Sequence, residues 1–268
     1  MTEDLGDGPV ASEVATSSGQ PGSPVKPGRA RRSTALLVAL ALAGGIAFAT
    51  VFAFAVTRLH AQNQQISFRP AGIPANVSTS MADQMQLSPV PTAAAPGFTL
   101  TDQQGRQVSL ASFRGKTVVL TFMDPHCTDI CPIVSREFID AHHYLGATGS
   151  KVVFVAVNVN QFHNQVSDVA AFSRAHQLDS IGPWYFLTGS LPSMRAVWGA
   201  YQIQVVAPSR NADIRHTSLI YFIDPRGRER FVAAPMVDHT KQGIAYLPPG
   251  QLTSWARSIA LVAKDVTP

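Results

Sequence analysis

The sequence lacks the motifs of several common functional classes. It contains neither the phosphate-binding pattern G-x-x-x-x-G-K-S/T nor the patterns H-E-x-x-H and G-x-S-x-G of zinc proteases and serine hydrolases. Its charges are scattered, and no basic run is interleaved with aromatic residues, so the formal net charge of +4 does not indicate a nucleic-acid-binding protein. No internal repeat is evident. These absences exclude the function classes that such patterns define.

The N-terminal part of the chain changes composition three times. Residues 1–34 have almost no large apolar side chains and predict a disordered tail, because they bury too little surface to offset the entropy of ordering. Residues 35–57 carry no charge and, at about 1.5 Å per residue, are long enough to span a bilayer. A cleaved signal peptide is the alternative, but its apolar core is usually only about 7–15 residues long. Residues 58–95 are polar and contain prolines, which indicates a flexible tether.

The basic residues around the apolar run predict its orientation. Four precede the run and two follow it, namely Lys26, Arg29, Arg31 and Arg32, then Arg58 and Arg69. Cytoplasmic flanks carry the excess of Lys and Arg. We therefore expect a single-pass protein of the cell membrane with a cytoplasmic N-terminus and an extracytoplasmic C-terminal domain, in a compartment where thiols can oxidise.

Residues 96–268 have the length and pattern of one folded domain. Apolar strand-like runs alternate with helix-like segments, and a hairpin and a last helix follow. We predict strands at 116–124, 151–159 and 184–189, helices at 129–146, 165–178, 190–201 and 248–264, and hairpins at 97–110 and 217–231. This order predicts an α/β, thioredoxin-like domain with a central mixed β-sheet flanked by helices, preceded by one N-terminal transmembrane helix.

Cysteine is scarce, because Cys127 and Cys131 are the only two in 268 residues. Both lie in TFMDPHCTDICPIVSREF, residues 121–138, where the predicted strand meets the predicted helix. The first N–H groups and the dipole of a helix stabilise thiolates. At a spacing of four residues on a helix, both sulfurs project from one face and can form a disulfide or bind one soft metal ion. A purely structural disulfide explains the placement poorly, since so short a loop removes little chain entropy.

A soft ion held by two thiolates usually takes a third ligand. The sequence has eight histidines, and most of them are predicted to lie on helix or loop surfaces. His126 adjoins Cys127 and is interpreted as a neighbour of the ligands. His216 directly precedes an apolar strand, where a thioredoxin-like fold turns a loop toward its cysteine site. Its position makes His216 the leading candidate for the third ligand.

Two stretches of residues 96–265 resemble the Sco/SenC family. They are Cys127-x-x-x-Cys131-Pro132 after the TFMD strand, and His216-Thr217 before LIYFIDPRG. The resemblance implies a membrane-anchored, thioredoxin-like copper protein in which Cys127 and Cys131 are thiolate ligands and His216 is the imidazole ligand. Members of this family assist assembly of the binuclear copper centre of cytochrome c oxidase, and some act mainly in thiol redox chemistry.

The chain departs from the family pattern at three places. Thr128 stands where the family usually has Pro, and Arg215 stands where it usually has Asp. NVNQFHNQ, residues 158–165, replaces an acidic, proline-containing stretch. Such changes alter the surface that meets a partner, or mark a divergent branch with a task other than oxidase assembly.

Three functions remain open from the sequence. The leading one is a copper metallochaperone in which Cys127, Cys131 and His216 bind copper as Cu(I), and also as Cu(II), and pass it to a copper-accepting protein such as a cytochrome oxidase subunit. A thiol-disulfide reductant is its second expected partner. The alternative is a membrane-tethered thiol-disulfide oxidoreductase in which Cys127 attacks and Cys131 resolves, which needs no third ligand. The last is an interaction domain with one inert disulfide.

Overall fold

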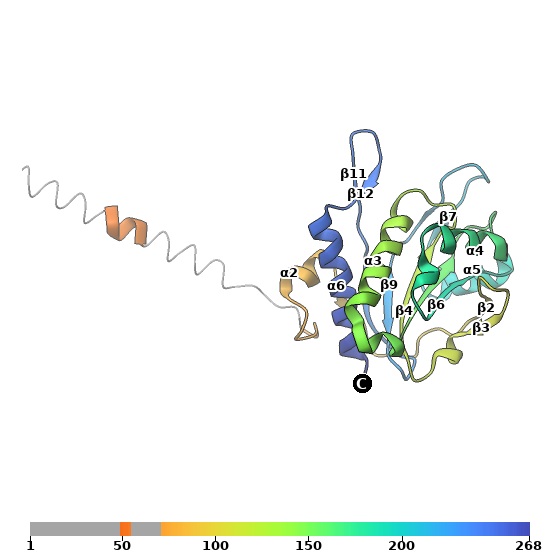
Figure 1. Ribbon diagram of the computed structural model, residues 1–268, viewed down its shortest axis with the longest axis horizontal. Coiled ribbons are helices and arrows are strands. Elements are labelled where there is room, and N and C mark those ends of the chain that lie inside the picture. The colour runs from red at the N-terminus through yellow and green to blue at the C-terminus, as the bar shows by residue number, and fades with distance from the viewer. Residues whose placement is uncertain (1–48, 55–70) are drawn as a thin grey trace, which may run out of the picture. The chain divides into compact units, whose positions relative to one another are not determined.

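The computed structural model describes residues 49–54 and 71–268 (Figure 1). The chain divides into two units, Met1–Ile66 and Ser67–Pro268. In the first unit only the helical residues 49–54 are described, so the predicted tail at 1–34 and most of the predicted membrane segment at 35–57 lie outside the described residues. No helix within 49–54 or 71–268 has both the length and the apolar character needed to cross a bilayer.

The second unit is built on a six-stranded mixed β-sheet. Its strands, in spatial order, are β1 (Ser88–Pro89), β10 (Glu229–Ala233), β9 (Ile220–Ile223), β4 (Thr117–Met123), β5 (Val152–Asn158) and β6 (Trp184–Leu187). The neighbours β4, β5 and β6 are parallel, whereas β9, β10 and β1 join by antiparallel pairing. Every residue of β4 and β5 is buried, as expected for parallel strands with both faces covered.

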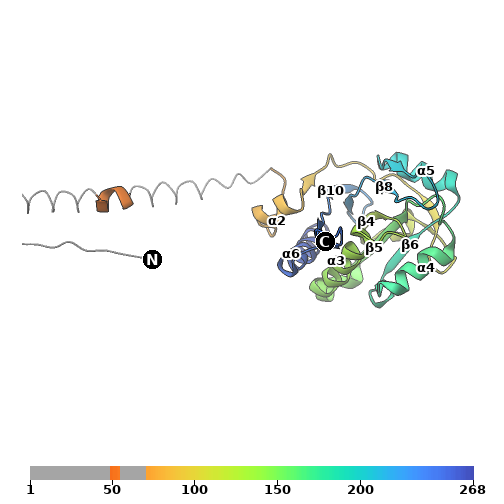
Figure 2. The ribbon, with the colours of Figure 1, turned by 90° about the horizontal axis from the view of Figure 1, so that it is seen from above.

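Helices cover both faces of the sheet (Figure 2). The longer helices are α3 (Ile130–Leu145), α4 (Val166–Ala175), α5 (Leu191–Ala200) and α6 (Pro249–Val266). Successive side chains of a strand point to opposite faces. Val119 of β4 accordingly packs in one core with Phe138 of α3 and with side chains of α4 and α6. Its neighbour Val118 packs in the other core, which contains Trp198 of α5 and the small sheet of β2 and β3.

Short elements complete the unit. They are the 3-10 helices η1 (Leu110–Phe113), η2 (Gly146–Lys151) and η3 (Leu178–Ser180), and the two-stranded pairs β2 (Thr99–Thr101) with β3 (Gln107–Ser109), β7 (Val205–Val206) with β8 (Arg215–His216), and β11 (Asp238–His239) with β12 (Ala245–Tyr246). The pair β7–β8 matters for the site, because it carries His216 and pairs it with Val205.

The predicted α/β class is confirmed, and the arrangement fits the thioredoxin-like fold. Each predicted strand and helix between residues 116 and 201 is present in the predicted order. The predicted hairpin at 217–231 adds β9 and β10 as antiparallel strands beside β4. The predicted hairpin at 97–110 forms β2 and β3, and Gly105 in its turn has a φ of 82°, which glycine adopts without steric cost.

The described part of the predicted tether, residues 71–95, is instead part of the folded unit. It contains the helix α2 (Thr79–Gln84) and the edge strand β1. Val77, Met85 and Leu87 are buried in the core shared with α6. The Ser78 hydroxyl accepts a hydrogen bond from the Met81 N–H at 3.2 Å and so caps α2. The folded unit therefore includes residues 71–95, which precede the predicted domain start at residue 96. Isolated apolar residues among polar ones, rather than one apolar run, place this segment in the core.

Candidate metal centre

Asp124 shapes the loop that carries Cys127. It follows β4 directly and is only 6 % exposed. Its Oδ1 accepts hydrogen bonds from the His126 N–H and from the Asn160 side-chain amide, each at 2.8 Å. Its backbone carbonyl accepts a hydrogen bond from the Cys127 N–H at 3.1 Å. This buried network, which the sequence alone does not reveal, fixes the position of Cys127.

Both cysteines are free thiols, and they are unequal. Cys131 lies in the first turn of α3 and is 2 % exposed, whereas Cys127 is half-buried in the loop before it. The Cys131 thiol donates a hydrogen bond to the Cys127 sulfur, and the Cys131 N–H points at the same sulfur from 3.4 Å. These donors lower the pKa of Cys127 to about 7, although burial opposes the shift. The pKa of Cys131 is raised, because its thiol proton is held by Cys127 and the group is buried.

His216 lies in β8 as a neutral imidazole. Burial is the main cause that lowers its pKa, and the hydrogen bond to Thr217 opposes the shift. Its Nδ1 lies 3.0 Å from the Thr217 carbonyl oxygen. Since a carbonyl only accepts, Nδ1 carries the proton, and the lone pair that can bind a metal is on Nε2. A backbone contact of this kind is typical of metal-binding histidines, where it fixes the tautomer and the ring.

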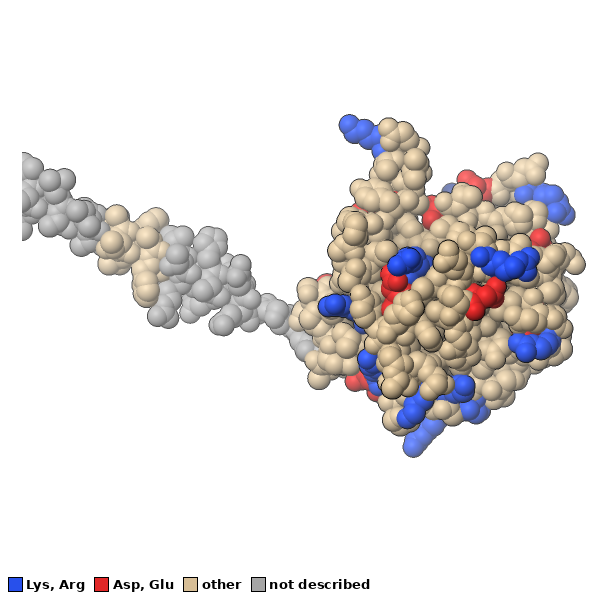
Figure 3. All heavy atoms as spheres, in the orientation of Figure 1, with Lys and Arg blue, Asp and Glu red and all other residues tan. Residues whose placement is uncertain are grey.

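Cys127 and His216 line one cavity of about 880 Å³. Its walls come from the loop after β4, the loop after β5, the segment before and within β8, and the hairpin β11–β12. Arg210, Asp213 and Arg215 also line it, so both signs of charge stand around the thiols. Basic and acidic side chains are likewise interspersed over the face of the folded unit in Figure 3.

The structure brings the three predicted ligands to the same region, but their donor atoms do not all lie within 4.8 Å of one another. Cys127 contacts Cys131, and Cys127 shares the cavity with His216. Within residues 49–54 and 71–268, one set of three histidine, cysteine or carboxylate donors lies within 4.8 Å of each other, and it is a different set. The ligand set Cys127, Cys131 and His216 thus stays a prediction, and a side chain must move for all three to reach one ion.

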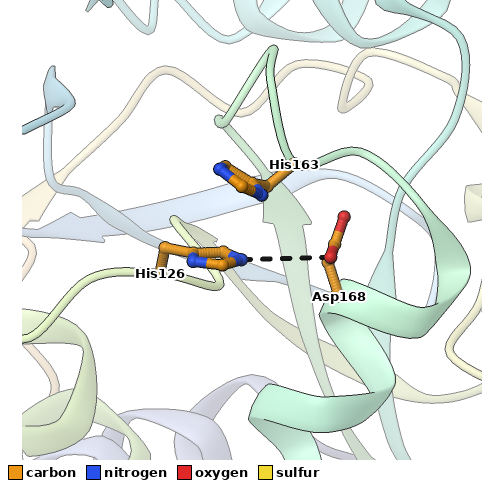
Figure 4. Close-up of side chains that lie close together, drawn as sticks. All are labelled: His126, His163 and Asp168. Atoms are coloured by element: carbon orange, nitrogen blue, oxygen red, sulfur yellow. Dashed lines mark ion pairs between the residues drawn. The ribbon is translucent and has the colours of Figure 1, made fainter. Parts of the chain in front are cut away.

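The three residues whose donor atoms do lie this close together are His126, His163 and Asp168 (Figure 4). The two imidazole rings are stacked with centroids 3.7 Å apart, and His126 Nε2 lies 3.9 Å from Asp168 Oδ1. Sequence reasoning interprets His163 as an ordinary surface residue and does not single out Asp168. The sequence signal that could have pointed to this cluster is the histidine in NVNQFHNQ, which stands where the family usually has an acidic stretch.

Comparison with protein families decides the affiliation of the chain. The model of the SCO1/SenC family matches residues 88–245, which is more than half of the chain. This chain belongs to the SCO1/SenC family. The match includes Cys127, Cys131 and His216, and it begins at β1, within the segment predicted as a tether.

Individual relatives of this SCO1/SenC protein fall into two groups. A SCO1 protein homolog of Bacillus subtilis is 26 % identical over 133 residues, which are 49 % of this chain and 68 % of that protein. A chloroplastic peroxiredoxin Q of Sedum lineare is 32 % identical over 104 residues, 39 % of this chain and 50 % of that protein. The matched region therefore spans only half of the peroxiredoxin.

A solved structure supports the same affiliation. ScoI of Bradyrhizobium japonicum with copper bound is 25 % identical, with a TM-score of 0.50. The likeness covers 65 % of this chain and 99 % of the ScoI chain. The folded unit of this SCO1/SenC protein thus corresponds to nearly the whole of that structure.

Proposed function

We propose that this protein is a copper-binding metallochaperone that delivers copper to an acceptor protein outside the cytoplasm in cytochrome c oxidase assembly. The observation that carries the proposal is the contact between Cys127 and Cys131 together with the cavity that Cys127 shares with the neutral imidazole of His216. Membership of the SCO1/SenC family and the likeness to a ScoI structure with copper bound support it.

The donors suit copper more than other ions. Thiolates are soft ligands that select Cu(I), and an imidazole is a good ligand for Cu(I) and Cu(II) alike. A structural zinc site usually has four protein ligands, which this set does not supply. The pKa of about 7 gives Cys127 a large thiolate fraction at neutral pH. Binding of copper then displaces the proton of Cys131, whose buried thiolate is stabilised by the cation.

The proposed acceptor reaches the cargo through the cavity. Cys127 and His216 line its wall, so an acceptor with thiolate or imidazole ligands can replace them one at a time. We further propose that residues 35–57 anchor the protein in the cell membrane, with the N-terminus in the cytoplasm and the folded unit outside it. There a thiol-disulfide reductant would keep Cys127 and Cys131 competent to bind Cu(I).

The unequal thiols favour a second candidate function, thiol-disulfide exchange. Cys127 has the lowered pKa of an attacking thiol, and Cys131 has the buried position of a resolving one. The Cys127 thiolate would attack a substrate disulfide and release one substrate thiolate, leaving a mixed disulfide. Cys131 would lose its proton and displace the second thiolate, which leaves Cys127 and Cys131 oxidised and the substrate reduced. This chemistry needs no His216.

The two functions are separated by a Cu(I) competition titration of the full chain in detergent, with a chromophoric chelator under anaerobic conditions. Cys127→Ser and Cys131→Ser should each lose nearly all tight binding. His216→Ala should weaken binding tenfold or more, which corresponds to about 1.4 kcal/mol or more. His143→Ala, which removes an exposed imidazole on α3, is the matched control and should bind like the wild type.

A disulfide reductase assay on the same variants decides between the two functions if the copper titration does not give the expected result. If His216→Ala binds Cu(I) as tightly as the wild type while both serine variants lose disulfide reductase activity, the metallochaperone proposal is wrong. The exchange function then replaces it.

A further inference from the structure

A cluster of two imidazoles and one carboxylate lies beside the cysteine pair. His126, His163 and Asp168 each offer one donor atom, and the three atoms lie within 4.8 Å of one another. The histidines come from the loops after the parallel neighbours β4 and β5, and Asp168 comes from the first turn of α4 (Figure 4). Carboxyl ends of neighbouring parallel strands are the usual position of binding sites in α/β proteins.

The backbone that presents these side chains is held by buried amides. The Asn160 Oδ1 accepts hydrogen bonds from the N–H groups of Phe162 and His163, at 2.9 and 3.1 Å. The Asn158 side chain donates to the His163 carbonyl at 2.8 Å. Asp124 holds the N–H of His126, as described above. The loops are thus fixed, while the side chain of His126 is 51 % exposed and can rotate.

One carboxylate oxygen of Asp168 is engaged and the other faces His126. Oδ2 accepts a hydrogen bond from the Gln165 N–H at 3.0 Å and caps α4. Oδ1 lies 3.9 Å from His126 Nε2. Two ligands that bind an ion at about 2.0–2.1 Å stand at most about 4.2 Å apart, so this pair already has a compatible separation. A ring nitrogen of His163 lies within 4.8 Å of both atoms, so the three donors already surround one point.

We propose that His126, His163 and Asp168 bind one divalent transition-metal ion, and Cu(II) most tightly. Two imidazoles and a carboxylate form a borderline-hard donor set, which suits Cu(II), Ni(II) and Zn(II) and disfavours Cu(I). For such a set, affinity rises through the first-row divalent ions to a maximum at Cu(II). Mg²⁺ and Ca²⁺ prefer oxygen ligands alone and should bind weakly.

The proposed site opens on the same cavity as the cysteine pair. His126 and His163 line the cavity together with Cys127 and His216, and His126 adjoins Cys127 in the chain. The wall of the cavity thus carries the sulfur of Cys127 and the imidazole of His216, and also the imidazoles of His126 and His163. The second site shares no ligand with the first, so it can be tested in a protein that has no thiols.

The test uses the full chain in detergent, with Cys127→Ser and Cys131→Ser combined so that Cu(II) is neither reduced nor bound by sulfur. Copper(II) sulfate is titrated against glycine as a competitor, and electron paramagnetic resonance reports the nitrogens bound to the ion. We expect one Cu(II) coordinated by two imidazole nitrogens. In this background, His126→Ala, His163→Ala and Asp168→Asn should each weaken binding tenfold or more, and each histidine variant should show one nitrogen fewer.

Matched variants separate this site from other imidazoles and from misfolding. His143→Ala, which removes an exposed imidazole on α3 in the same background, should leave Cu(II) affinity unchanged. Asp168→Asn keeps an oxygen that can cap α4, and His126→Gln keeps a polar side chain, so both should retain the circular dichroism spectrum. The proposal is overturned if the thiol-free protein holds no Cu(II) against glycine. It is equally overturned if His216→Ala removes the ion while the three cluster variants retain it.

Discussion

At the scale of single residues, the hydrogen bond between the two thiols sets the chemistry of Cys127. The thiol of Cys131 stabilises the Cys127 thiolate and lowers its pKa to about 7. Removing the thiol donor with Cys131→Ala should return this pKa toward the ordinary value of about 8.5, which reduces the thiolate at pH 7 roughly tenfold. The rate of Cys127 alkylation by iodoacetamide, followed from pH 5 to 10, measures the change.

The direction in which the alkylation rate changes with pH depends on which form of the thiol reacts. The thiolate is the nucleophile, so the wild-type rate should fall as the pH drops below about 7, and the variant rate should fall below a higher pH. Cys131 in the wild type should react slowly throughout, because it is buried and its pKa is raised. Superimposable profiles for the wild type and Cys131→Ala would show that the thiol hydrogen bond has no such effect.

The residues of the site differ in how well the sequence predicts them. Cys127 and Cys131 are rare and close in the chain, so their pattern and position indicated a site directly. His126, His163 and Asp168 meet only because two parallel strands end side by side, and nothing in their local sequence specifies that meeting. The local sequence likewise does not show that Asp124 is buried and hydrogen-bonded to the His126 N–H and the Asn160 side chain.

At the scale of elements, the helix α3 carries a buried carboxyl group that has no hydrogen-bond partner among the described residues. Glu137 of α3 is fully buried, and neither of its oxygens has a hydrogen-bond partner among the described residues. Burial therefore raises its pKa well above the usual range. The folded state retains the proton of Glu137 while the unfolded chain releases it near pH 4.3. Glu137 consequently lowers stability as the pH rises through the interval between the two pKa values.

Replacing this carboxyl should stabilise the protein at neutral pH. Glu137→Met has a similar volume and no polar atom that needs a partner, so we expect a gain of about 1–3 kcal/mol at pH 7. The gain should shrink toward pH 4 and below, where most of the glutamate is neutral in the unfolded chain as well. Thermal melts of both proteins at several pH values measure it, with Asp265→Asn on the exposed side of α6 as control. A variant less stable than the wild type at pH 7 would contradict this account.

Long elements with a regular apolar pattern could be predicted from the sequence, and short elements could not. The strands β4 and β5 are continuous runs of buried residues, and α3 has a clear apolar face, so local pattern suffices for them. The helix α2 has six residues and the strand β1 has two, too few for any period to appear. These two elements form because they pack on the surfaces of α6 and β10. The local sequence carries no information on those distant surfaces.

At the scale of the whole molecule, the segment 71–95 belongs to the stability of the folded unit. It buries several apolar side chains against α6 and covers the edge of β10. A chain that begins at residue 96 should therefore lose stability relative to one that begins at residue 71, by roughly 2–5 kcal/mol after the entropy of ordering the segment is subtracted. Urea unfolding of the two fragments, followed by circular dichroism, measures the difference.

A point variant checks that the loss arises from packing. Met85→Ala in the longer fragment removes one fully buried side chain at the junction with α6 and should cost about 2–5 kcal/mol. The same substitution at exposed Met236 should change stability little. Equal midpoints for the fragments that begin at residues 71 and 96 would mean that the segment contributes nothing to folding.

The two ends of the folded unit are joined, and this has a consequence for its biosynthesis. The side chain of Asn76 donates a hydrogen bond to the Leu261 carbonyl at 2.9 Å, and the Ser254 hydroxyl donates to the Gln84 side chain at 2.8 Å. A ribosome makes the early partner long before the late one. The segment 71–95 must therefore wait through the synthesis of α3, β5 and α5 before its binding surface exists. During that interval its apolar side chains are open to any general chaperone that meets the nascent chain, and the unit closes only when α6 has been made.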